Sequence, residues 1–208
     1  MDLLVVGLGN PGAEYAGTRH NVGAEAVDLL AARHEGNLSA EKGLRARVGE
    51  IRIGGLRVLL AVPTTYMNES GIAVAALVRR AGVDRPPEDD DRPAPRAGGA
   101  ERTSRLVVVH DELDLPAGRV KVKVGGGTAG HNGLQSVHAH LHSGDYLRVR
   151  IGIGKPPGRQ AGADYVLKRP GASEREILRV ATEVAADAVE TIAAEGVEAA
   201  MQRIHSAD

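Results

Sequence analysis

Five short polar clusters interrupt otherwise apolar segments of this 208-residue sequence. Histidine can serve as a general base, a carboxylate can orient it, and asparagine amides can bind carbonyl groups. The set offers His20 as a possible base, and it offers no convincing nucleophile pair. The clusters are Asn10 in GLGNPG, Arg19-His20-Asn21 in TRHN, Asn68 in PTTYMNESG, His110-Asp111-Glu112 in VVVHDELDLP, and His131-Asn132-Gly133 in GGGTAGHNG.

Each cluster also has an ordinary structural explanation. An asparagine beside a glycine is usually a turn residue, and an aspartate at a strand end is often a cap. No single cluster therefore identifies a site, and a functional prediction depends on several of them meeting in space.

The glycines at 7, 9 and 12 spell G-x-G-x-x-G after a strand-like run, which is the pattern of a dinucleotide-binding loop. Pro11 removes one backbone N–H from this loop, and residues 15–21 intervene before helical periodicity begins. The acidic residue that such a fold needs after a second strand is missing, since Asp28 falls within a helical pattern. We instead expect these glycines to let the loop approach a substrate closely.

A metal site is a further alternative because the sequence contains eight histidines. His138, His140 and His142 alternate, and we interpret them as an exposed polar helix end because no carboxylate motif accompanies them. The absence of cysteine excludes disulfides, thiolate catalysis and cysteine-ligated zinc. We therefore expect no catalytic metal.

Apolar runs and helical spacing alternate along the chain, which predicts an α/β sandwich with a mixed sheet flanked by helices. Three of the five polar clusters directly follow strand-like runs, and loops at the carboxyl ends of strands tend to converge on a site. Strands are predicted over 3–8, 45–53, 56–62, 106–110, 119–124 and 147–153, and helices over 24–33, 70–81 and 174–195.

Residues 83–105 differ in composition from the rest, with four prolines, an acidic run and no periodicity. We predict a disordered surface insertion there, within a single domain that spans 1–208.

The net charge is −1, but residues 115–169 carry nine lysines and arginines against two aspartates. This basic middle fits a local anion-binding face, or simply an arginine-rich surface. The sequence lacks a signal-peptide pattern and an apolar run of membrane-spanning length, so we expect a cytoplasmic protein without membrane contact.

Four motifs in this order resemble the bacterial peptidyl-tRNA hydrolase family, and together they are highly specific. The resemblance runs from Leu3 to about Arg203 and is interrupted by the insertion at 83–105. The motifs are GLGNPGAEYAGTRHNVG (7–23), PTTYMNESG (63–71), HDELDLPAGRVKVKVGGGTAGHNGL (110–134) and RVRIGIGKP (148–156).

The resemblance implies a mixed, twisted sheet and a monomer that works without a cofactor. It implies hydrolysis of the ester between peptide and tRNA, which recycles tRNA from stalled or dropped-off peptides. The implied general base is His20, and Asp111 is implied to support it. A mobile lid is implied at Asp164–Leu167, where Tyr165 replaces a frequent phenylalanine.

The same resemblance implies two groups of binding residues. The substrate-binding group is Asn10, Tyr15, Met67, Asn68, His131 and Asn132, and the tRNA phosphate-binding group is Lys123 and Arg150.

Two other classes of function remain open at this point. An NAD-dependent enzyme would use the GLGNPG loop and would bind a nicotinamide cofactor. A non-catalytic RNA-binding module would use the basic segment and would keep its function without His20 and Asp111.

Overall fold

Seven strands form one mixed sheet in the computed structural model, which describes residues 1–83, 104–158 and 161–206. The strand order is β2-β3-β4-β1-β5-β7-β6. The four central strands β4, β1, β5 and β7 run parallel, and β2, β3 and β6 pair antiparallel at the two sides. The strands are β1 (Leu3–Gly7), β2 (Ser39–Glu41), β3 (Ala46–Ile53), β4 (Leu56–Pro63), β5 (Leu106–Glu112), β6 (Val120–Val124) and β7 (Leu147–Gly152).

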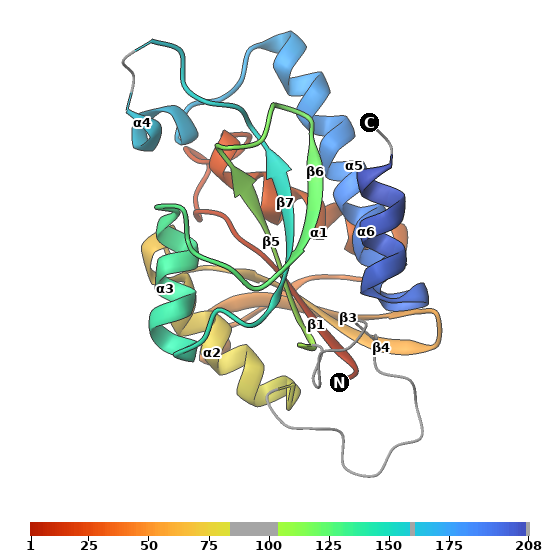
Figure 1. The fold of residues 1–208 in the computed structure, drawn as a ribbon. Helices are drawn as coiled ribbons and strands as arrows, with labels where there is room; N and C mark the ends of the chain where they lie inside the picture. The colour runs from red at the N-terminus through yellow and green to blue at the C-terminus, as the bar shows by residue number, and fades with distance from the viewer. Residues whose placement is uncertain (84–103, 159–160, 207–208) are drawn as a thin grey trace.

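Helices cover both faces of this sheet, which confirms the predicted α/β class (Figure 1). One layer contains α1, α5 and α6, the other contains α2 and α3, and α4 lies beyond the carboxyl ends of β5 and β7. The helices are α1 (Val22–Arg33), α2 (Ser70–Ala81), α3 (Asn132–Leu141), α4 (Gly162–Val166), α5 (Ala172–Glu195) and α6 (Val197–His205), with 3-10 turns η1 (Arg19–Asn21), η2 (Lys42–Leu44) and η3 (Met67–Glu69).

The alternation of side chains along β1 divides the core between the two layers. Leu3 and Val5 belong to the cluster beneath α1 and α5, whereas Leu4 and Val6 belong to the cluster beneath α2 and α3. All four are fully buried, as expected for a central parallel strand covered on both faces. The continuous apolar run at 3–8 therefore reflects its central position in the sheet.

Gly7 at the end of β1 and Gly9 just after it serve helix packing, which corrects the expectation that they approach a substrate. A Cβ on Gly7 would lie 2.4 Å from the carbonyl oxygen of Gly23 in α1. A Cβ on Gly23 would lie 2.3 Å from the carbonyl oxygen of Val109 in β5, and one on Gly9 would lie 2.9 Å from Cβ of Ala24. These contacts let α1 lie directly against β1 and β5, close to the ends of both strands.

Several element bounds differ from those predicted. β5 continues to Glu112, so the polar cluster at 110–112 lies within the strand and not after it. In β6, Val120 and Val122 are buried because α5 and α6 pack against that strand. The predicted insertion at 83–105 lies outside the described residues except for 83, 104 and 105.

Within the described ranges, no helix is long and apolar enough to cross a membrane.

Candidate active site

Polar residues gather where the parallel strands β1, β4 and β5 end. The loop after β1 carries Asn10 and leads to His20 in η1, and η3 follows soon after β4. Asp111 lies near the end of β5, and His131 immediately precedes α3. The parallel topology thus brings four segments that are distant in sequence to one edge of the sheet.

His20 and Asp111 form a buried hydrogen-bonded pair. His20 Nδ1 lies 2.9 Å from Asp111 Oδ1 and 3.0 Å from Oδ2. Burial alone would raise the pKa of Asp111, but the charges and hydrogen bonds of His131 and His20 outweigh it and hold that pKa well below its usual value. The ionised carboxylate must accept, so His20 donates from Nδ1–H and keeps its lone pair on Nε2.

His131 gives Asp111 a second donor. Its Nε2–H donates to Asp111 Oδ1 at 2.8 Å, and its Nδ1 accepts the backbone N–H groups of Gly133 and Leu134 at 3.1 and 3.3 Å. His131 is therefore the side-chain N-cap of α3, and both ring nitrogens have assigned partners. This position makes it a support for Asp111, a role that the sequence did not indicate.

His110 lies behind this group and stays neutral. Its Nδ1–H donates to the backbone oxygen of Asp111 at 2.7 Å. Burial lowers the pKa of His110 to about 3. Nε2 of His110 is buried without a hydrogen-bond partner among the described residues, so protonation there would place an unpaired charge in the core.

A cavity of about 240 Å³ opens beside the pair. His20 and Asp111 line it together with residues 112–113 at the end of β5, 129–132 at the start of α3, and three residues of α4. Asn132 is exposed at this cavity, so its amide is available to a bound molecule. The predicted lid at Asp164–Leu167 largely coincides with α4, which forms one wall.

Asn10 is fixed by its own neighbours. Its backbone N–H donates to Asn21 Oδ1, and Asn21 Nδ2 donates to the Asn10 carbonyl oxygen, both at 2.9 Å. Asn10 Oδ1 accepts the backbone N–H of Met67 at 2.7 Å. These bonds join the loop after β1 to η3 and leave Nδ2 of Asn10 as the group that can donate to a carbonyl.

The two neighbours in η3 differ in exposure. Met67 is buried, and a Cβ on Gly133 would lie 2.5 Å from its sulfur, so Met67 packs beneath the surface of the site. Asn68 is exposed and can reach a ligand. Of the six predicted substrate-binding residues, Met67 is the one that the structure places below the surface.

Tyr15 and Tyr66 form an aromatic pair at the same end of the molecule. Their ring centroids are 6.3 Å apart with an interplanar angle of 80°, and Tyr66 is 54% exposed. Tyr66 was missed in the sequence, although its place beside Met67 in a chain with only four aromatic residues could have indicated it.

The predicted phosphate ligands lie on β6 and β7. Lys121 stands opposite Arg150 in the ladder, and Lys123 is exposed two residues further along the same face. Arg150 is not a free cation, since its Nε and Nη2 donate to Glu112 Oε2 at 3.1 and 3.0 Å. Neither this ion pair nor the position of Lys121 was expected from the sequence.

The histidines near the end of α3 have separate partners. His138 Nε2 lies 3.0 Å from Nη2 of the buried Arg148, so His138 is not simply part of an exposed end. His140 Nδ1 donates to the Ser136 carbonyl oxygen at 2.8 Å.

Only one group in the described part of the chain could hold a metal ion. The donor atoms of His20, Asp111 and His131 lie within 4.8 Å of one another. Both imidazoles already donate N–H to the carboxylate, so a metal would have to replace those protons. The hydrogen bonds among these three side chains account for their arrangement without a metal ion.

The comparisons with known proteins all agree on one family. The family model described as peptidyl-tRNA hydrolase matches residues 4–89 and 100–208. A peptidyl-tRNA hydrolase of Nocardia farcinica is 49% identical over 97% of this chain and 95% of its own length, and that of Kineococcus radiotolerans is 47% identical over 98% and 96%. The crystal structure of peptidyl-tRNA hydrolase from Acinetobacter baumannii matches with a TM-score of 0.83 at 34% identity, over 97% of this chain and 93% of that one.

Proposed function

The chain belongs to the peptidyl-tRNA hydrolase family, and from this premise we propose how its buried residues cleave the ester between a peptide and tRNA. The observation that carries the proposal is the 2.9 Å bond between His20 Nδ1 and Asp111 Oδ1 in the wall of a cavity. This bond orients the imidazole ring through Nδ1 and leaves Nε2 of His20 to act as the base.

In the proposed mechanism, His20 removes a proton from a water molecule that attacks the ester carbonyl carbon. The imidazolium that forms is stabilised by the ionised Asp111. The tetrahedral intermediate then collapses, the C–O bond to the ribose breaks, and the ribose oxygen takes the proton back from His20. An ester has a good leaving group, so direct attack by water suffices, and the products are a free peptide and tRNA.

Asparagine amides hold the substrate in this proposal. The Nδ2 group of Asn10 and the exposed amides of Asn68 and Asn132 can donate to the developing oxyanion or to the peptide backbone. A free aminoacyl-tRNA has a charged ammonium group where peptidyl-tRNA has an amide, and it would leave these partners badly paired. The enzyme thereby recognises a peptide without reading its side chains.

In this proposal, the tRNA binds to the exposed surface of β6 and β7. Lys123, with Lys121 on the same face, is exposed on β6, and Arg150 lies opposite Lys121 with its side chain 22% exposed. Contacts to phosphates fit any tRNA, because they carry no base sequence. The Tyr15–Tyr66 pair supports a place for the end of the nucleic acid next to the cleavage site. We further propose that the protein is a monomer acting in the cytoplasm as one domain.

The test is hydrolysis of N-acetylaminoacyl-tRNA beside its unacetylated counterpart, with a chelator present. We expect cleavage of the acetylated substrate and strong discrimination against the free amine. Equal cleavage of both substrates would refute the recognition mechanism, and loss of activity on chelation would refute the metal-free one.

A further inference from the structure

The loop between β1 and η1 carries Asn10 and Tyr15 and ends at His20, so its position determines the shape of the substrate cleft. The segment formed by α4 and residues 167–170 lies against the end of this loop, since the Arg19 backbone N–H donates to the Lys168 oxygen. Arg19, which directly follows the loop, donates to carbonyl groups of the segment with α4, and Arg169 of that segment donates to carbonyl groups of the loop. We call residues 10–18 the substrate loop.

Arg19 reaches from the end of the substrate loop into the segment after α4. Its Nη1 donates to the carbonyl oxygens of Tyr165 and Lys168 at 3.3 and 3.2 Å, and its backbone N–H donates to the Lys168 oxygen at 3.2 Å. Nε and Nη2 hold both oxygens of Glu174 in α5 at 2.6 Å. The buried guanidinium therefore has partners on several sides, as a charge in a low-dielectric site requires.

Tyr165 completes this side of the contact. Arg19 Cζ lies 4.0 Å from the centre of the Tyr165 ring, and the Tyr165 hydroxyl donates to the Ile153 carbonyl oxygen at 2.9 Å. The phenol, which stands where the family often has phenylalanine, thus ties α4 to the backbone just beyond β7. These bonds fix the end of α4 that faces η1.

Arg169 makes the reverse contact. Its Nε donates to the carbonyl oxygen of Ala16 at 2.8 Å, and its Nη2 donates to that of Ala13 at 3.0 Å. Arg169 is exposed, and water could satisfy these two carbonyls without it. What the planar guanidinium adds is geometry, since it holds two points of the substrate loop at once.

We propose that Arg19 and Arg169 form a reciprocal clasp that sets the distance between the substrate loop and α4, and that Arg169 is a positioning residue for substrate binding. The inference rests on the proposed function, in which Asn10 and Tyr15 bind the substrate. Arg169 acts through the loop backbone and does not itself touch tRNA. This distinguishes it from Lys123, whose expected role is direct contact with phosphate.

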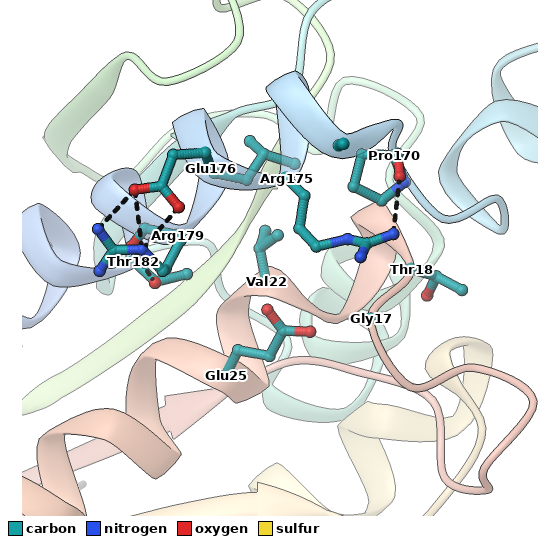
Figure 2. Close-up of a pocket in the computed structure, with 11 residues that line it drawn as sticks. Gly17, Thr18, Val22, Glu25, Pro170, Arg175, Glu176, Arg179 and Thr182 are labelled. Carbon is teal, nitrogen blue, oxygen red and sulfur yellow. Dashed lines mark hydrogen bonds and ion pairs between the residues drawn. The ribbon is translucent and has the colours of Figure 1, made fainter.

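Arg175 provides a matched control, because it is another exposed arginine a few residues away. Figure 2 shows its guanidinium turned towards Pro170, whose carbonyl oxygen lies 3.4 Å from Nη2. It borders a cavity of about 350 Å³ between α1 and α5, and no hydrogen bond from Arg175 to the backbone of residues 12–16 is found among the described contacts. Arg175→Ala therefore removes the same charge without releasing the clasp.

The experiment measures steady-state hydrolysis of N-acetylaminoacyl-tRNA by Arg169→Ala, Arg169→Lys and Arg175→Ala at several salt concentrations. Loss of two hydrogen bonds should raise KM about tenfold in Arg169→Ala, with kcat within about twofold of wild type. Lysine keeps the charge but cannot bridge both carbonyls, so Arg169→Lys should resemble Arg169→Ala. Arg175→Ala should behave as wild type.

Salt dependence separates the clasp from a phosphate contact. The slope of log(kcat/KM) against log salt should be unchanged in Arg169→Ala, whereas loss of a phosphate ligand would flatten it by about one unit. A flattened slope, a wild-type KM in Arg169→Ala, or full rescue by lysine would each overturn the proposal.

A readout without substrate keeps the clasp testable if the proposed function fails. Amide hydrogen exchange in residues 12–18 and 162–168 should accelerate in Arg169→Ala and not in Arg175→Ala, while other protected amides stay unchanged. Inactivity of the wild type on the acetylated substrate would refute the function alone. Unchanged exchange in Arg169→Ala would refute the clasp.

Discussion

The acid–base centre near the end of β5 and the basic face of Lys121, Lys123 and Arg150 on β6 and β7 are built in opposite ways. At the centre, His20 and Asp111 are buried, and hydrogen bonds assign a place to each proton. On the basic face, Lys123 projects into solvent, and only Arg150 is held by a carboxylate. The chemical step depends on groups that are oriented before the substrate arrives, whereas binding any tRNA requires only positive charges at suitable positions.

The largest effect is expected from removing the base of the acid–base centre. His20→Ala should lower the single-turnover rate by on the order of 10²–10⁴ and leave tRNA affinity within about twofold, because the base is lost but the basic face is intact. Filter binding of tRNA and rapid-quench hydrolysis measure the two quantities. His140→Ala is the control, since that exposed histidine donates to the Ser136 carbonyl oxygen within α3. Near-normal hydrolysis by folded His20→Ala would exclude His20 as the base.

Asp111→Asn should slow the reaction by a smaller factor than His20→Ala. The amide removes the charge that stabilises the imidazolium. An amide oxygen in place of Oδ1 can still accept from both histidines, while the NH₂ group takes the place of Oδ2, 3.0 Å from His20 Nδ1. Single-turnover rates of the two variants decide the order. A loss in Asp111→Asn that equals or exceeds that of His20→Ala would assign the base to Asp111.

His110 should make the fold sensitive to acid. Because its pKa falls from 6.5 to about 3, the folded state binds fewer protons than the unfolded chain between these values, and stability decreases as pH falls through that window. The contribution is about 1.4 kcal/mol per pH unit. His110→Asn keeps a donor near Nδ1 and cannot ionise, so urea unfolding at pH 7 and pH 4.5 should show a smaller loss than in wild type. Equal losses would mean that another group causes the acid sensitivity.

The smallest effects are expected on the basic face, and they should distinguish Lys123 from Arg150. Lys123→Ala and Arg150→Ala should each raise KM more than they lower kcat and reduce the salt slope by about one unit. Arg150→Ala should also lower the melting temperature, because it removes the cation bonded to Oε2 of the buried Glu112 carboxylate. Lys123→Ala should leave the melting temperature unchanged. Unaltered salt slopes in both variants would place the tRNA elsewhere.

The sequence predicted the acid–base centre better than the side-chain contacts around it. The alternating pattern predicted a mixed α/β sheet, and the strand-end rule together with the motif resemblance proposed His20 with Asp111. The structure brings these two residues together across 91 positions of sequence. Periodicity and motifs succeed here because the approximate positions of buried strands follow from local patterns.

Contacts that depend on side-chain direction could not be predicted in the same way. The bond from His131 to Asp111, the ion pair of Arg150 with Glu112, and the clasp of Arg19 and Arg169 all join separate elements whose relative orientation is set by packing. The glycines at 7 and 9 were misinterpreted for the same reason, since their need for small size arises from α1 lying on the sheet. No local pattern distinguishes a glycine that faces a helix from one that faces a ligand.

The most direct test of the division between chemistry and binding is a double-mutant cycle with Asp111→Asn and Lys123→Ala, measured as kcat/KM on N-acetylaminoacyl-tRNA. If the buried centre acts on the ester and the basic face acts only on tRNA, the two losses in transition-state stabilisation should add within about 0.5 kcal/mol. A coupling energy above about 1 kcal/mol would contradict the account, because it would show that the two regions act as one site.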